Sequence, residues 1–185
     1  MKSHYRRPGI LAAAAALVLG AGVAGTTQAS AAPQSPERSS RPAGPQDYGW
    51  IRNANSGHCL AVPGASTQNG MGLIQWGCGT WRDHFWQFEF AFGSGGRSYF
   101  RIRNLNSGQC LAVPGASTTA GVQVIQWPCG EYKDHYWGVD YTSKGMRLVN
   151  WNSGQCLAVP GASMAQGEKI IQWPCGDWPD HYWNF

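Results

Sequence analysis

The chain has 185 residues, enough for one domain or two small ones, and it is rich in aromatic residues and poor in charged ones. Its formal net charge of +4 includes Lys2, Arg6 and Arg7 of an N-terminal leader; without them, 11 basic residues face 10 acidic ones. This near-neutral balance excludes broad electrostatic binding to nucleic acid or to anionic membranes.

Residues 1–31 are predicted to form a secretory signal peptide. A basic stretch, Lys2 to Arg7, precedes an apolar stretch, Ile10 to Gly25, which is too short to span a membrane as a helix. Ala29-Ser30-Ala31 has the small residues of a cleavage site, with cleavage expected after Ala31. We therefore expect a secreted, extracellular protein without membrane insertion.

Residues 32–46 are rich in Pro, Ser, Ala and Arg and show no apolar periodicity. This composition predicts a disordered tether between the signal peptide and the rest of the chain.

Three copies of one unit fill the chain from residue 47 to residue 185. The phrase Asn106 to Ser117 recurs unchanged at Asn152 to Ser163, and with one change, His58 for Gln, at Asn55 to Ser66. Each copy is followed by Ile-Gln-Trp-x-Cys-Gly and closes on Asp-His-aromatic-Trp. A fixed period of this kind indicates a repeat architecture, with units of about 45 residues at roughly 47–92, 93–138 and 139–185.

Each unit is predicted to contain four short strands. Turn signals such as Asn55-Ser56-Gly57 and Pro63-Gly64 separate apolar or alternating stretches, and no helical period is present. The strands predicted in the first unit are 48–53, 59–62, 72–76 and 85–90.

The later units open in the same way, with strands predicted at 99–104 and 145–150. The step from the first unit to the second is five residues longer than the step from the second to the third. The extra residues fall between Trp86 and Asn104, in the connection between the units, and Gly93 to Gly96 is predicted to form a loose hairpin there. No unit has the character of a solenoid cap. We therefore expect the twelve strands to close around a threefold axis as an all-β protein, a β-trefoil.

The six cysteines occur in an exported chain, which favours disulfides over zinc. Each unit holds two cysteines 19 positions apart. Because the units are alike, each pair is predicted to close within its own unit: Cys59–Cys78, Cys110–Cys129 and Cys156–Cys175.

The unit resembles the ricin-type lectin repeat, a carbohydrate-binding β-trefoil found in plant toxins and in secreted bacterial, including actinobacterial, proteins. The resemblance covers residues 47–185 and rests on S-G-x-C-L-x-V (Ser107 to Val113), G-x-S (Gly115 to Ser117), V-I-Q-W-x-C (Val124 to Cys129) and the closing x-x-W (His135 to Trp137). It implies a lectin-like protein that binds glycans or polysaccharides.

The chain departs from that family at two positions in every unit. The family has a sugar-binding Asp after Cys-Leu, where this chain has Ala61, Ala112 and Ala158. The family closes with Asn-Gln-x-Trp, whereas this chain has Asp-His. These changes indicate either a rebuilt sugar site or a lost one.

The candidate sugar-binding residues lie in the Ile-Gln-Trp-x-Cys-Gly phrase of each unit and in the segment that follows it. The Trp after each Gln would stack on a sugar ring, and an aromatic residue two positions before each Asp would face the ligand. Each Asp would accept sugar hydroxyls or cap a local turn. The set is Gln75, Trp76, Trp81 and Asp83; Gln126, Trp127, Tyr132 and Asp134; Gln172, Trp173, Trp178 and Asp180. In each unit, the Trp, the second aromatic residue and the Asp should share one solvent-facing pocket.

Other recurring residues are interpreted as structural. The closing Trp86, Trp137 and Trp183 are expected in the core, and His84, His135 and His181 are expected to be buried and hydrogen-bonded. No metal site and no cofactor is predicted.

The sequence predicts a binding protein and not an enzyme. Every recurring carboxylate is present three times, whereas glycoside hydrolysis needs one distinct acid and one distinct base. We expect a monomer that binds glycans. The alternative is a trefoil with degenerate sugar sites that acts through protein contacts, as an inhibitor or adhesin.

Overall fold

The computed structural model describes residues 48–185, so the predicted signal peptide and tether lie outside the described residues. This part is all-β, with thirteen strands and six short 3₁₀ turns. None of its helices is long and apolar enough to cross a membrane. The predicted fold class is confirmed.

The strands follow the three units. The first contributes β1 (Gly49–Trp50), β2 (Arg52–Asn53), β3 (Cys59–Ala61), β4 (Ile74–Trp76) and β5 (Phe85–Ser94). The second contributes β6 (Arg97–Asn104), β7 (Cys110–Ala112), β8 (Ile125–Trp127) and β9 (Trp137–Thr142). The third contributes β10 (Gly145–Asn150), β11 (Cys156–Ala158), β12 (Ile171–Trp173) and β13 (Trp183–Asn184). The count exceeds twelve because the first predicted strand, 48–53, is interrupted at Ile51.

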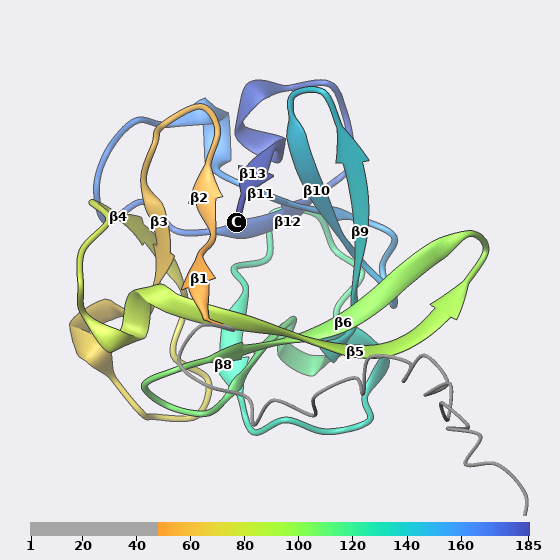
Figure 1. Ribbon diagram of the computed structural model, residues 1–185, viewed down its shortest axis with the longest axis horizontal. Coiled ribbons are helices and arrows are strands. Elements are labelled where there is room, and N and C mark those ends of the chain that lie inside the picture. The colour runs from red at the N-terminus through yellow and green to blue at the C-terminus, as the bar shows by residue number, and fades with distance from the viewer. Residues whose placement is uncertain (1–47) are drawn as a thin grey trace, which may run out of the picture. The chain divides into compact units, whose positions relative to one another are not determined.

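The first and last strands of the units close a barrel. Hydrogen-bonded neighbours run β1-β5-β6-β9-β10-β13-β2, and β1 and β2 are the two halves of one predicted strand, so the circle is complete. Figure 1 shows β5 and β6 as the longest hairpin of this barrel. Closure removes the exposed sheet edges that promote aggregation.

The middle strands form three hairpins, β3–β4, β7–β8 and β11–β12, which meet one another at the threefold axis. Leu73 N–H donates to the Val124 carbonyl, Val124 N–H to Ile170, and Ile170 N–H back to Leu73, each at 2.9 Å. All three side chains are fully buried. This cyclic set of bonds locks the three units to one another.

The closing tryptophans lie in the core, as predicted. Trp86, Trp137 and Trp183 are fully buried, and their indole N–H groups donate to the carbonyls of Leu60, Leu111 and Leu157 at 2.9–3.0 Å. A buried indole without a partner would cost the desolvation of its N–H, so these bonds make the core position favourable.

The β5–β6 connection differs from the prediction of a loose hairpin. Ser94 pairs with Arg97, and only Gly95 and Gly96 lie between them, at φ +57° and +76°. Two successive residues with positive φ match the right-handed twist of the flanking strands, and glycine adopts that conformation without steric cost. The turn is therefore tight.

All three predicted disulfides are present: Cys59–Cys78, Cys110–Cys129 and Cys156–Cys175. Each ties the first strand of a central hairpin to the segment just after the second strand. They hold the loop that carries the candidate site residues close to the hairpin.

Candidate functional site

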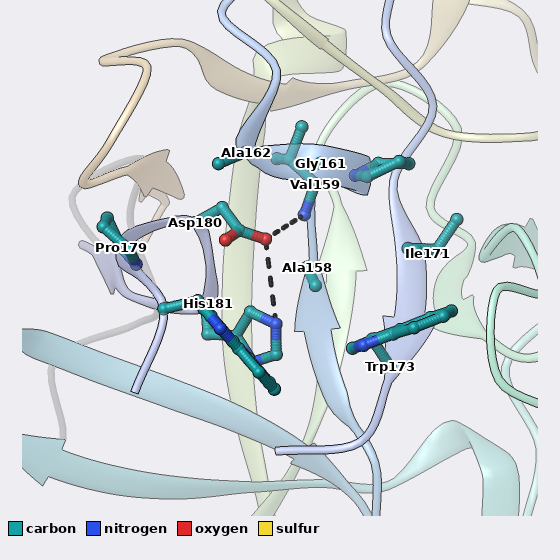
Figure 2. A pocket seen from close by; sticks show the side chains of 11 residues that line it. Ala158, Val159, Gly161, Ala162, Ile171, Trp173, Pro179, Asp180 and His181 are labelled. Carbon is teal, nitrogen blue, oxygen red and sulfur yellow. Dashed lines mark hydrogen bonds and ion pairs between the residues drawn. The ribbon is translucent and has the colours of Figure 1, made fainter. Parts of the chain in front are cut away.

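Each unit carries one equivalent pocket on its outer side. The three have volumes of about 330, 340 and 500 Å³ in the first, second and third unit. We call them the first, second and third pocket. Figure 2 shows the third, with Trp173 on one wall, Asp180 and His181 on the other, and Ala158 between them.

The floor and upper wall come from the repeated Ala-Val-Pro-Gly-Ala segment. In the third unit, β11 ends at Ala158, and Pro160 begins a 3₁₀ turn because it cannot donate to a sheet ladder. Gly161 and Ala162 then take positive φ values of +58° and +53°. The turn bends the chain over the end of the strand, and its small side chains leave the hollow open.

One wall is the Trp that follows each Gln. Trp76, Trp127 and Trp173 are each 42% exposed, which is high for a residue of this size. The edge of Trp173 lies against Gly121 of the preceding unit, where an added Cβ would be 3.5 Å from the ring. Each indole is therefore held by a neighbouring unit while one face stays open to the pocket.

The second aromatic residue lines the same pocket. Trp81, Tyr132 and Trp178 are 58%, 62% and 50% exposed. Each ring lies over the Gly of its own Cys-Gly pair, where an added Cβ would overlap the ring. Each ring also leans on the following His, with centroids 5.0–5.2 Å apart. The sequence Cys-Gly-x-aromatic-x-Asp-His thus positions an exposed ring on a rigid support.

The aspartates lie at the inner end of each pocket and are 5–6% exposed. Asp134 Oδ2 accepts a hydrogen bond from Val113 N–H at 3.3 Å, and Asp180 Oδ2 accepts one from Val159 N–H at 3.2 Å. The backbone N–H groups that these two carboxylates bond belong to the Ala-Val-Pro-Gly-Ala segment and not to the 3₁₀ turn that carries the Asp. The carboxylates of Asp134 and Asp180 thus tie their turns to the hairpins of the same units.

The histidines are buried, as expected, and each lines its pocket beside the Asp. Burial lowers the pKa of His84, His135 and His181 below the usual 6.5, against the opposing effect of the adjacent carboxylate. The imidazole Nε2 lies 3.5–3.7 Å from Asp Oδ2. The neutral imidazoles therefore bring no positive charge to the pockets at pH 7.

The expected hydrogen bond of the histidines is present in one unit. Nδ1 of His135 accepts a bond from Gly130 N–H at 3.3 Å, which places the proton of the neutral ring on Nε2, toward Asp134. Nδ1 of His84 and Nδ1 of His181 are buried and have no partner among the described residues.

The glutamines do not line the pockets, and the prediction that they contact ligand is corrected. Gln75, Gln126 and Gln172 are fully buried. Gln126 Oε1 accepts from Ser107 Oγ at 2.7 Å, and its Nε2 donates to the carbonyls of Ser66 and Gln68 of the first unit at 2.9 and 3.0 Å. The equivalent bonds are present in the other units, so each Gln links its own unit to a neighbouring one.

The structure brings the other predicted residues together as the sequence required. Trp76, Trp81 and Asp83 share the first pocket, and their equivalents share the other two. The prediction missed the apolar lining: the Pro-Gly-Ala turn, the Val before it, and Ile74, Ile125 and Ile171. The available signal was an apolar Ala-Val-Pro-Gly-Ala phrase repeated without change in a segment that turn residues place at the surface.

Comparison with known proteins agrees with the fold. The model of a family described as ricin-type beta-trefoil lectin domain-like matches residues 38–89 and 84–173, which is more than half of the chain. A search of curated proteins found no match.

Among solved structures, the designed threefold-symmetric protein ThreeFoil is 29% identical, with a TM-score of 0.70, over 75% of this chain and 96% of that one. An exo-beta-1,3-galactanase from Clostridium thermocellum is 24% identical, with a TM-score of 0.68, over 73% of this chain but only 29% of the enzyme. The C-half of an earthworm R-type lectin in complex with GalNAc is 14% identical, with a TM-score of 0.57, over 74% of this chain and 95% of that one.

Proposed function

The chain belongs to the ricin-type β-trefoil lectin-like family, and on that premise we propose that it is a secreted, non-catalytic carbohydrate-binding protein with up to three similar, shallow sugar sites. The family and its lectin relatives support carbohydrate binding in general. The linings of the three pockets indicate which residues of this chain would contact the sugar.

One observation carries the proposal: every unit presents two exposed aromatic rings and one carboxylate around the same hollow. In the third pocket these are Trp173, Trp178 and Asp180. The CH-rich face of a sugar stacks on flat apolar rings, and a carboxylate accepts its hydroxyl groups and fixes its orientation. We assign these three positions in each unit to ligand contact, and we omit the buried glutamines.

The alanine after Cys-Leu belongs to this rebuilt site. Ala61, Ala112 and Ala158 form the floors of the pockets and carry no hydrogen-bonding side chain. The carboxylate enters from the opposite wall, on the 3₁₀ turn that ends at His84, His135 or His181. Polar recognition therefore moves from the hairpin to the loop after the disulfide.

One feature of the pockets supports binding without catalysis, and the disulfides support a location outside the cell. Each of the three pockets is lined by a single carboxylate, whereas glycoside hydrolysis uses two carboxyl groups about 5–9.5 Å apart. Three disulfides suit an oxidising compartment, in agreement with the N-terminal sequence.

A glycan array with the oxidised mature protein tests the proposal. We expect binding to a defined set of glycans, and quenching of tryptophan fluorescence when the selected glycan is added in solution. Trp76→Ala, Trp127→Ala and Trp173→Ala combined should abolish binding while the thermal transition is retained. Tyr141→Ala, which removes another exposed aromatic residue outside the three pockets, is the matched control. A folded wild-type protein that binds no glycan contradicts the proposal.

A second candidate, action through protein contacts, is favoured by one observation. Phe90, Tyr141 and Phe185 are 64%, 83% and 59% exposed, and the last two line a separate hollow with Phe88 and Phe100. Exposed aromatic residues of this kind are typical of protein-binding surfaces. Phe90→Ser with Tyr141→Ser should then abolish a partner interaction and leave glycan binding unchanged.

A further inference from the structure

We propose that the pockets select a sugar unit that carries a positively charged amino group, and that the third pocket binds it most tightly. This inference rests on the proposed carbohydrate-binding function and specifies the class of ligand. The chemistry required is an ammonium group on a CH-rich body.

The first step is the state of the three pocket carboxylates. Asp83, Asp134 and Asp180 are the only buried carboxylates among the described residues. Within 4 Å each has only its histidine as a basic neighbour, and burial keeps that histidine neutral at pH 7. A buried negative charge without a cationic partner is costly, so a cation that enters the pocket gains a strong interaction.

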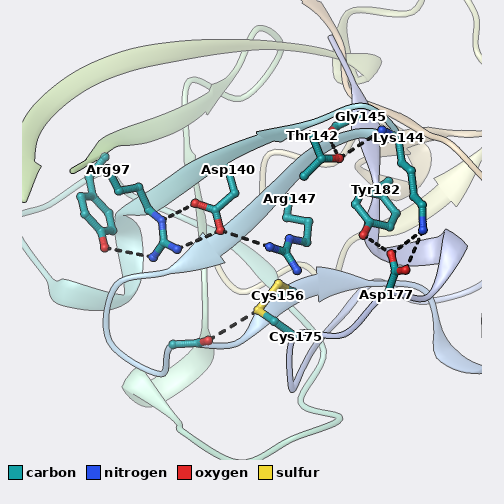
Figure 3. A network of polar contacts seen from close by, with 12 residues as sticks. Arg97, Asp140, Thr142, Lys144, Gly145, Arg147, Cys156, Cys175, Asp177 and Tyr182 are labelled. Atoms are coloured by element: carbon teal, nitrogen blue, oxygen red, sulfur yellow. Dashed lines mark hydrogen bonds and ion pairs between the residues drawn. A yellow bond between two sulfur atoms is a disulfide. The ribbon is translucent and has the colours of Figure 1, made fainter. Parts of the chain in front are cut away.

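The other acidic groups that lie close to bases show the contrast. Glu89 contacts Arg101 and Arg103, Asp140 contacts Arg97 and Arg147, and Asp177 contacts Lys144. Figure 3 shows the Asp140 and Asp177 pairs. The side chains of these carboxylates are 24–70% exposed, yet they have cationic partners, while the buried ones in the pockets have none.

The second step is the aromatic lining. An ammonium group beside the face of an indole or phenol ring is attracted by the ring quadrupole, by about 0.5–2 kcal/mol. Trp173 and Trp178 line the pocket that Asp180 closes at its inner end, and apart from His181 the rest of the wall is apolar. Such a wall stacks against the CH groups of a sugar ring and strengthens the attraction between the carboxylate and the ammonium group, because it excludes water.

The third step ranks the pockets. The residue just before the Asp is Arg82 in the first unit, Lys133 in the second and Pro179 in the third. Arg82 and Lys133 do not line the first and second pockets, so the ranking rests on volume: the third pocket is the largest of the three, at about 500 Å³. One base acts against this preference: Arg147 is close enough to lower the pKa of His181, but its guanidinium pairs with Asp140 at 3.7 Å.

The experiment compares matched sugars that differ only at C2. Glucose, glucosamine and N-acetylglucosamine form one series, and galactose, galactosamine and N-acetylgalactosamine form the other. Choline provides an ammonium group without a sugar. Affinities of the oxidised mature protein at pH 7 are measured by calorimetry, and NMR of the indole N–H groups of Trp173 and Trp178 locates binding in the third pocket.

The expected result is that one amino sugar binds about tenfold more tightly than both its neutral and its N-acetylated counterpart. Asp180→Asn keeps the shape and the bond to Val159 N–H but removes the charge, so it should abolish this preference in the third pocket. Glu168→Gln removes one negative charge outside the pockets and should leave the preference unchanged. If Asp180→Asn does not fold, Asp83→Asn with NMR of the Trp76 indole repeats the test in the first pocket.

Each other outcome has a distinct meaning. Neutral sugars that bind as tightly as amino sugars would overturn this inference and leave the proposed function intact. If the protein binds choline but none of the sugars, the proposed function is overturned, and the ligand is an ammonium compound other than a sugar. Absence of all binding would overturn both.

Discussion

At the scale of single residues, glycines and histidines decide where the exposed aromatic rings lie. Gly79, Gly130 and Gly176 leave the space that Trp81, Tyr132 and Trp178 occupy. The histidines support the same rings from the other side. A ring held in this way loses little conformational entropy when a ligand stacks on it.

Gly176→Ala should weaken sugar binding in the third pocket without a large loss of stability. The new Cβ overlaps the Trp178 ring, and the ring is half-exposed, so it can move away from the pocket. We expect a several-fold loss of affinity at this pocket, measured by NMR titration, and a change of about 1 kcal/mol or less in the free energy of unfolding. Gly93→Ala, which meets no close atom, is the control. Unchanged affinity would show that Trp178 does not contact ligand.

The buried histidines predict that stability falls at mildly acidic pH. Their pKa values are lower in the folded state than the ordinary 6.5, so the unfolded chain binds more protons as the pH falls below about 6.5. The stabilisation is complete above that pH and is lost as the pH falls toward the folded-state pKa values. Thermal unfolding at pH 7.5 and 5.5 measures the effect, and His84→Gln with His135→Gln and His181→Gln should flatten it.

At the scale of elements, the unit is incomplete by itself. The Gln at the centre of β4, β8 or β12 bonds the loop of a neighbouring unit, and the Trp beside it rests on that neighbour's glycine. Each pocket wall therefore depends on two units. The Gln that bonds the neighbouring unit and the Trp that lines the pocket are successive residues of one strand. They have different roles because adjacent side chains of a strand point to opposite faces.

Gln126→Met should destabilise the fold and leave the affinity of the folded protein unchanged. The substitution keeps the volume but leaves Ser107 Oγ and the carbonyls of Ser66 and Gln68 without their partner. The expected loss is about 3 kcal/mol in urea unfolding. Gln68→Met, on an exposed side chain, should change stability by less than about 0.5 kcal/mol. A loss of affinity in folded Gln126→Met would restore the glutamine as a ligand contact.

At the scale of the whole molecule, the threefold arrangement presents three similar pockets on one rigid body. Single weak sites on such a body act together on a polymeric ligand, because the second contact forms at a high effective concentration. The pockets are similar but not identical, since the residue before the Asp, the second aromatic residue and the volumes differ.

Removing the pocket tryptophans one at a time should therefore affect polymer and monomer differently. Trp76→Ala alone should lower the stoichiometry for a monosaccharide from about three to about two, and Trp76→Ala with Trp127→Ala to about one. Retention on a polysaccharide column should fall much more steeply, by about tenfold or more for each site removed. Calorimetry and affinity chromatography measure the two effects. Equal losses in both assays would mean that the sites do not act together.

The sequence by itself determined the fold and the disulfides. Three copies of one phrase require three similar units, and symmetry then selects one cysteine pairing of the many that six cysteines allow. It also placed Trp76, Trp81 and Asp83 in one pocket, because the same spacing recurs in each unit.

Only the tertiary structure decided which polar side chains face the ligand. Gln75 and Trp76 are neighbours in sequence, but one faces the adjoining unit and the other the solvent, and that depends on strand register and on contacts with another unit. It also showed that the pocket carboxylates have no cationic partner among the described residues, since charge pairing is set by side chains that are distant in sequence. Local patterns specify a unit, whereas the environment of each side chain is fixed only when the three units pack together.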